Sequence, residues 1–156
     1  MELFKVMTGT RITAISYKGM QQVIIDVTAG RVDMVSENMA SILPHVKAGR
    51  VRGIAVTSLK RSTVLPEIPT LDEAGVPGFS MPLWSGYVFP VSVRREIVLR
   101  LNAEINKALQ SLVVRDKFAA LGYTPRGGTP EQFGEHIRSE IEKWGKVIKA
   151  AGIKPQ

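Results

Sequence analysis

An α/β fold is predicted by short apolar runs that alternate with helical segments. The runs at residues 12–15, 32–35 and 54–56 have the length and apolar character of buried strands. Between them, residues 20–29 and 38–48 carry apolar side chains at helical spacing, and a glycine follows each segment as it does after many helices. Strands separated by helices are typical of parallel pairing through right-handed crossovers. The first half of the chain is therefore predicted to be a strand–helix–strand unit.

Other signals in this half mark helix ends. Residues 1–8 predict a helix that a glycine ends. Pro44 lies inside the second helical segment and predicts a kink or a two-piece start. Thr70 and Glu73 have the spacing of a capping box, in which the two side chains each accept a backbone N–H at the start of a short helix.

The composition changes at about residue 83, where we place a change of lobe. Residues 83–89 form an extended apolar run that holds Trp84 and Gly86, and the glycine predicts a bend or a close backbone approach. An apolar stripe over residues 97–112 and a shorter segment at 114–121 predict two helices. Two domains follow from this division, 1–83 and 84–156.

A second capping box, Thr129 with Gln132, opens the last predicted helix. The glycines before it allow an anion site made by free backbone N–H groups, or a turn closed by the cap itself. We favour the turn, because the cap is already supplied. The predicted buried face of this helix consists of Phe133, Ile137, Ile141, Trp144, Ile148 and Ala151.

Composition excludes several classes of protein. The hydrophobic content of 44% is that of a globular chain, and no run approaches the roughly 18 apolar residues of a membrane span. The absence of cysteine excludes a disulfide framework and a thiolate metal site. The net charge of +7 arises from scattered basic residues that do not interleave with aromatic ones. This pattern favours attraction of small anions over nucleic-acid binding, and a small basic nucleic-acid-binding protein remains an alternative.

Motifs for catalysis are absent from the sequence. There is no Gly-x-Ser-x-Gly elbow, phosphate loop or His-Glu-x-x-His, and His45 and His136 lie in predicted helices without a nucleophile nearby. We therefore predict no enzymatic activity, no catalytic residue, no cofactor and no metal site.

The candidate ligand-binding residues lie where the predicted strands end. Ser36, Glu37 and Asn38 follow a buried strand, at the edge where open α/β sheets bind ligands. Asn38 and Ser36 are equally typical of helix N-caps, and both roles are compatible. Tyr17 follows the preceding strand and would neighbour the triplet in a parallel sheet. Trp84, at the change of lobe, is predicted either to line a cleft or to pack in a core.

An ordered series of short motifs carries a resemblance to a known family. No single motif is specific, but together they run over nearly all of the chain. They are Tyr17-Lys18-Gly19, Gly30-Arg31-Val32-Asp33, Ile42-Leu43-Pro44-His45-Val46-Lys47-Ala48-Gly49, Ile54-Ala55-Val56-Thr57-Ser58, Arg61, Leu65-Pro66-Glu67-Ile68-Pro69-Thr70, Glu73-Ala74-Gly75, Pro77-Gly78-Phe79, Trp84, Gly86, Leu101-Asn102, Gly122, Thr129-Pro130-Glu131-Gln132-Phe133 and Trp144. The series resembles the tripartite tricarboxylate transporter substrate-binding proteins, the Bug or TctC family of periplasmic solute receptors.

This resemblance implies a periplasmic binding protein-like fold of the type II, Venus flytrap kind, with two α/β lobes that close on a solute. Residues 1–83 then correspond to the remainder of the second lobe. Residues 84–156 correspond to a crossover strand and the helical C-terminal part of the first lobe. The family's signal peptide and its two main ligand loops precede the position of Met1, and residues 1–5 do not resemble a signal peptide. The N-terminal part of the fold is accordingly expected to be missing.

The resemblance also implies function. A full-length family member is a periplasmic receptor that carries a small carboxylate to membrane permease subunits, and this chain is expected to bind its solute weakly or not at all. Ser36-Glu37 stands where Phe-Asp is common in the family. The family's solute specificity is therefore not carried over to this chain. Uncovered sheet edges predict a homo-oligomer. The alternative is a shortened interaction module that self-associates or binds a protein partner without solute.

Overall fold

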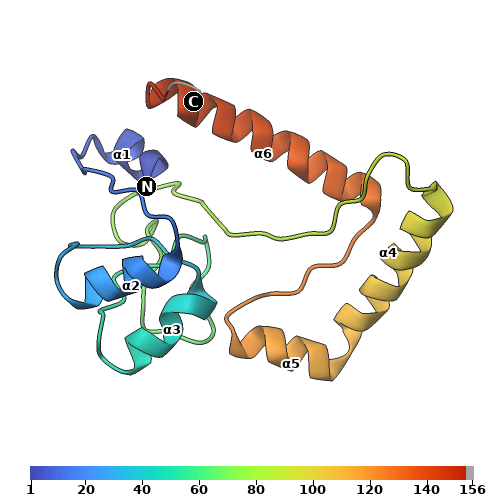
Figure 1. Cartoon of the computed structure of the whole chain (residues 1–156), viewed down its shortest axis with the longest axis horizontal. Helices are drawn as coiled ribbons and strands as arrows, with labels where there is room; N and C mark the ends of the chain where they lie inside the picture. The colour runs from blue at the N-terminus through green and yellow to red at the C-terminus, as the bar shows by residue number, and fades with distance from the viewer. Residues whose placement is uncertain (154–156) are drawn as a thin grey trace. The chain divides into compact units, whose positions relative to one another are not determined.

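The computed structural model describes residues 1–153, and the chain divides into two compact units, Met1–Leu83 and Trp84–Gln156. Their boundary coincides with the change of composition, while the assignment of the units to two lobes stays a prediction. Figure 1 traces helices α1 to α3 in the first unit and α4 to α6 in the second.

The first unit contains α1 (Glu2–Thr8), α2 (Met20–Thr28) and α3 (Met39–Lys47). Each helix is followed by a glycine in the left-handed region, Gly9 at φ 67°, Gly30 at φ 70° and Gly49 at φ 67°. This backbone conformation is open to glycine at little steric cost, so the predicted helix stops are confirmed. Pro44 is accommodated inside α3, which continues to Lys47 as one helix.

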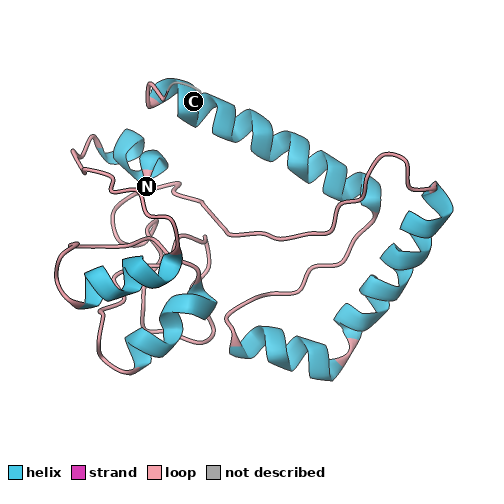
Figure 2. Cartoon of the chain, in the orientation of Figure 1, coloured by secondary structure: helices cyan, strands magenta, loops and turns pink. Residues whose placement is uncertain are grey.

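The predicted strands at residues 12–15, 32–35 and 54–56, and the crossover strand at 83–89, are wrong as regular elements. Within residues 1–153 the backbone pairing amounts to one isolated parallel bridge, Val56 with Thr70. Figure 2 accordingly draws helices and loops for the described residues. An apolar run becomes a strand only where a neighbouring segment supplies ladder hydrogen bonds. The apolar pattern does not reveal whether a pairing partner is available.

A small core lies around the bridge in the first unit. Leu43, Leu65 and Ile68 are buried together, and Met39, Val46, Val56 and Val64 pack around them. Phe79 is 2% exposed and meets the Phe4 ring edge to face, with centroids 6.3 Å apart. The α3 helix and the segment 64–79 thus supply most of what is buried in this unit.

The capping box predicted at Thr70 forms in full. The Thr70 backbone N–H donates to the Glu73 carboxylate at 2.8 Å, and the Glu73 N–H donates to the Thr70 hydroxyl at 3.1 Å. Residues 71–75 then make turns instead of the predicted short helix. Because Gly75 follows at once with φ 106°, the chain leaves the helical region before regular helical bonding is established.

The second unit contains α4 (Arg95–Gln110), α5 (Leu112–Ala120) and α6 (Pro130–Ala150), with α4 in contact with both other helices. Among its described side chains only Val147 is buried. The predicted buried face of α6 is wrong at Ile141 and Ile148, which are 68% and 45% exposed. Helical spacing identifies one face of a helix, but burial also needs an element to cover it.

Candidate functional site

The predicted ligand triplet lies directly before α3. Asn38 caps this helix, because its side-chain oxygen accepts the Ala40 N–H at 3.1 Å. Ser36 is exposed, and Glu37 and Asn38 are half-buried. The N-cap interpretation of Asn38 is confirmed, while solute binding by the three residues stays a prediction.

Tyr17 lies in a shallow hollow at the start of α2. The hollow is lined by the consecutive residues Ser16, Tyr17, Lys18, Gly19, Met20, Gln21 and Gln22. Gly19 is the N-cap of α2 and has no side chain with which to accept a hydrogen bond. The N–H groups of the first helical turn have no partner within the helix, so this end of α2 presents donors and partial positive charge toward the hollow. Lys18 adds a full positive charge beside them.

Asp26 holds Tyr17 in place from the middle of α2. The Tyr17 hydroxyl donates to Asp26 Oδ2 at 3.0 Å, and Gln22 Nε2 and Arg31 Nη1 donate to Oδ1 at 3.2 and 2.9 Å. The Arg31 hydrogen bond, followed by that of Tyr17, holds the pKa of Asp26 below its usual value. Desolvation, followed by the Asp26 hydrogen bond, raises the pKa of Tyr17 above 10.0.

Sequence reasoning missed the role of Asp26 and Arg31. The available signal was an acidic residue within the otherwise apolar sequence Val23-Ile24-Ile25-Asp26-Val27, five positions before an arginine. The expected closeness of Tyr17 to the triplet was inferred from a parallel sheet. Since the two strands concerned are not formed, that closeness also stays a prediction.

Trp84 is anchored to α6 within the second unit. Its ring meets Phe133 and His136 edge to face, with centroid distances of 5.7 and 4.9 Å. Its indole N–H donates to Glu140 at 3.3 Å, and the same carboxylate oxygen accepts the Trp144 indole N–H at 3.0 Å. The Trp144 hydrogen bond is the largest cause that lowers the pKa of Glu140. Trp84 thus contacts α6 but is 40% exposed and does not lie in a core, and its role in a cleft stays a prediction.

The glycine pair before α6 forms a closed turn. Thr129 and Gln132 complete the predicted capping box, with bonds of 2.9 and 3.2 Å. Asn106 accepts the Gly128 N–H at 2.9 Å, and both Asn102 and Asn106 donate to the Gly128 carbonyl at 2.9 Å. The turn interpretation is confirmed, because these donors and acceptors are already used by the protein itself.

Two other kinds of feature are absent from residues 1–153. No group of three or more His, Asp or Glu side chains there is arranged to hold a metal ion. Over the same residues, none of the helices combines the length and apolar character needed to cross a bilayer.

Comparison with known proteins gives a consistent set of matches. The model of the tripartite tricarboxylate transporter family receptor matches residues 1–153. Protein BugT of Bordetella pertussis is 39% identical over 98% of this chain and 47% of its own length. A UPF0065 protein from the tcbD-tcbE intergenic region of Pseudomonas sp. strain P51 is 42% identical over 86% of this chain and 40% of its own length.

Solved structures extend these matches to three dimensions. The Rhodopseudomonas palustris protein Rpa4515, solved with adipate, superposes with a TM-score of 0.92 at 40% identity. It is covered over 52% of its length by 99% of this chain. MatC from the same organism, solved with bound malate, has a TM-score of 0.79 at 28% identity, with 94% of this chain and 51% of MatC covered. The predicted α/β, periplasmic binding protein-like fold class is confirmed, and the chain spans about half the length of these relatives.

Proposed function

The chain belongs to the tripartite tricarboxylate transporter receptor family, and on this basis we propose that it forms part of the cleft of a periplasmic receptor for a small carboxylate. The receptor delivers its solute to a membrane permease and carries out no chemistry on it. Structures of relatives with adipate and with malate support the class of solute.

The observation that carries this proposal is the hollow at the start of α2. Its uncapped N–H groups and Lys18 are suited to a carboxylate, because helix N-termini favour anions and hydrogen bonds to a charged acceptor are strong. Ser36, Glu37, Asn38 and Trp84 are proposed as further ligand-binding residues.

Isothermal titration with mono-, di- and tricarboxylates tests this function. We expect residues 1–156 alone to bind with a Kd of about 1 mM or weaker, since they cover only 52% of the relative that was solved with adipate. Lys18→Gln should weaken binding severalfold. Lys60→Gln, which removes an exposed charge outside the hollow, is the matched control and should have no effect.

One result would contradict the expected weakness, and another would contradict the hollow as the site. Micromolar affinity would show that the hollow and its neighbours are sufficient, and would contradict the expected weakness. Equal loss in Lys18→Gln and Lys60→Gln would show that the anion is attracted by overall charge and that the hollow is not its site.

A second candidate function, self-association, is favoured by the exposed apolar surface of the second unit. Tyr87, Val88 and Leu112 are 75–76% exposed, and Val91 is fully exposed. Exposed apolar groups mark an interface where they gather in one patch. Multi-angle light scattering is expected to show a dimer or larger species that Leu112→Glu dissociates. A monomer at high concentration would contradict this function and leave the carboxylate proposal intact.

A further inference from the structure

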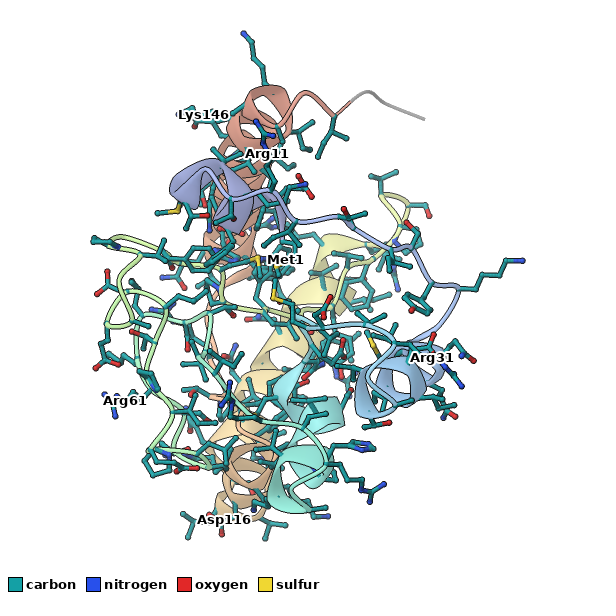
Figure 3. All side chains as sticks on the ribbon, turned by 90° about the vertical axis from the view of Figure 1, so that its left-hand side faces the viewer. Met1, Arg11, Arg31, Arg61, Asp116 and Lys146 are labelled. Carbon is teal, nitrogen blue, oxygen red and sulfur yellow. The ribbon has the colours of Figure 1, made fainter. Side chains whose placement is uncertain are left out.

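Two apolar runs of the first unit have backbone groups that no other segment of the described chain takes up. Residues 12–15 and 32–35 make no backbone–backbone hydrogen bond within the part of the chain that the structure describes. Figure 3 locates the start of each run, because the labelled Arg11 and Arg31 directly precede them. The amides and carbonyls of both runs are therefore available to pair with a further strand.

A third apolar run, residues 54–56, is paired along one edge only. The Val56 N–H donates to the Pro69 carbonyl at 2.8 Å, and the Val56 carbonyl accepts the Leu71 N–H at 2.9 Å. Neighbouring residues of an extended segment direct their backbone groups to opposite edges. Ala55 has no backbone–backbone hydrogen bond among residues 1–153, so the edge opposite Pro69 and Leu71 is open there.

Apolar side chains on the three runs are exposed as well. Ile15 is 58% exposed, Met34 36% and Ile54 64%. Single exposed apolar residues are ordinary, but these three lie on segments whose backbone edges are also open. An open edge that carries apolar side chains is suited to the addition of a strand from another polypeptide.

The lengths of the relatives indicate which polypeptide fits. This chain superposes on Rpa4515 with a TM-score of 0.92 and covers 52% of it, so about half of such a receptor is polypeptide that residues 1–156 do not contain. A UPF0065 protein from the clcB-clcD intergenic region of Pseudomonas knackmussii is 33% identical over 94% of this chain, and the match covers 87% of its own length. That sequence also consists mainly of the half that this chain represents.

We propose that the open edges at residues 12–15, 32–35 and 54–56 take up strands of a separate polypeptide, namely the half of a receptor of this family that this chain does not cover. The structure supports assembly without a covalent link, because the helices and the small core of the first unit are formed within residues 1–83 alone. The inference goes beyond the proposed function, since assembly requires no solute.

Mixing residues 1–156 with the separately expressed part of Rpa4515 that lies outside the match tests the proposal. Analytical ultracentrifugation should show a 1:1 complex with a Kd of about 1 μM or tighter. An excess of the half-receptor should also convert any homo-oligomer of residues 1–156 into this complex. The two halves of Rpa4515, expressed and mixed in the same way, are the matched control.

Hydrogen exchange of the complex shows where the half-receptor binds. The amides of residues 12–15 and 32–35 and of Ala55 should exchange about tenfold or more slowly than in the isolated chain, because each gains a partner. The Thr70 amide already donates to Glu73 at 2.8 Å and should change least.

A pair of substitutions at equally exposed residues tests the open edge itself. Ile54 is 64% exposed and Leu59 is 62% exposed, so neither Ile54→Lys nor Leu59→Lys should disturb the isolated chain. Ile54→Lys should weaken the complex about tenfold or more, because a charged side chain on an edge opposes strand addition. Leu59→Lys lies outside the three runs and should leave the Kd unchanged. Circular dichroism of each variant alone checks that its fold is kept.

The outcomes separate this assembly from its rivals. Absence of the 1:1 complex would overturn the proposal, whether or not the halves of Rpa4515 assemble, and so would equal weakening by the two lysine substitutions. A homodimer that an excess of the half-receptor does not convert would assign the open edges to a second copy of this chain. A 1:1 complex with slowed exchange at the three runs that binds no adipate would support the assembly and count against the receptor function.

Discussion

Residues 1–83 contain five of the six buried side chains among those described, whereas residues 84–153 contain only Val147. The number of buried side chains does not increase with the length of the helices. The second unit has helices of 16 and 21 residues, and no helix of the first exceeds nine. Capping boxes and glycine stops form in both units, so local signals suffice for local structure. A core requires in addition that segments distant in sequence meet, as α3 does with residues 64–68.

The largest loss of stability expected to test this difference in burial is that of a substitution at Phe79. Phe79→Ala removes a side chain that is 2% exposed and should destabilise the first unit by about 3–5 kcal/mol. Phe89→Ala, at a phenylalanine of the second unit that is 38% exposed, is the chemical match and should cost about 1 kcal/mol. Hydrogen exchange read separately on peptides from each unit would measure both. Similar losses of protection in the two variants would erase the contrast in burial.

A smaller effect is expected where the second unit does pack closely. Gly86 faces the Phe133 ring, and a Cβ atom there would overlap that ring, so the predicted close approach is confirmed. Gly86→Ala should cost about 1–3 kcal/mol through the displacement of Phe133 and of the neighbouring Trp84. Gly145→Ala, at an open position in α6, should instead stabilise the helix by about 0.5–1 kcal/mol. Urea unfolding followed by tryptophan emission measures both, and a destabilised Gly145→Ala would contradict the open surface assigned to α6.

The parts of the molecule that the sequence predicts are those set by residues close together in the chain. The helix stops and both capping boxes need only three to six consecutive residues, whereas the turn at Gly127 and Gly128 is also held by Asn102 and Asn106. The strands at 12–15 and 32–35 failed because pairing depends on a neighbour that the apolar pattern does not specify.

The candidate site likewise contains one feature that neighbouring residues specify and one that they do not. The capping role of Asn38 follows from its place before α3, two residues from the N–H that it accepts. The link between Tyr17 and Asp26 spans nine residues, with a bend at residues 18–19 between the two side chains. No spacing in the sequence identifies a side chain whose role is to hold another side chain in place. Asp26 was missed for this reason.

The smallest expected effect compares the same capping box in the two units. Thr70 is 1% exposed and Thr129 is exposed, so Thr70→Ala should cost about 2 kcal/mol and Thr129→Ala about 1 kcal/mol, as N-cap losses do.

The partner of Thr70 is Glu73, whose pKa is lowered chiefly by the Thr70 N–H and then by Arg61, whereas the partner of Thr129 is the uncharged Gln132. A lowered folded pKa contributes stability that is present above the usual value near 4.5 and is lost as the pH falls through the folded value. Acid should therefore weaken the first box and spare the second, and hydrogen exchange of the Thr70 and Thr129 amides between pH 3 and 7 measures this. Glu73→Gln should abolish the acid sensitivity at Thr70. If the Thr70 amide kept its pH dependence in that variant, the sensitivity would have to come from the unit as a whole and not from its cap.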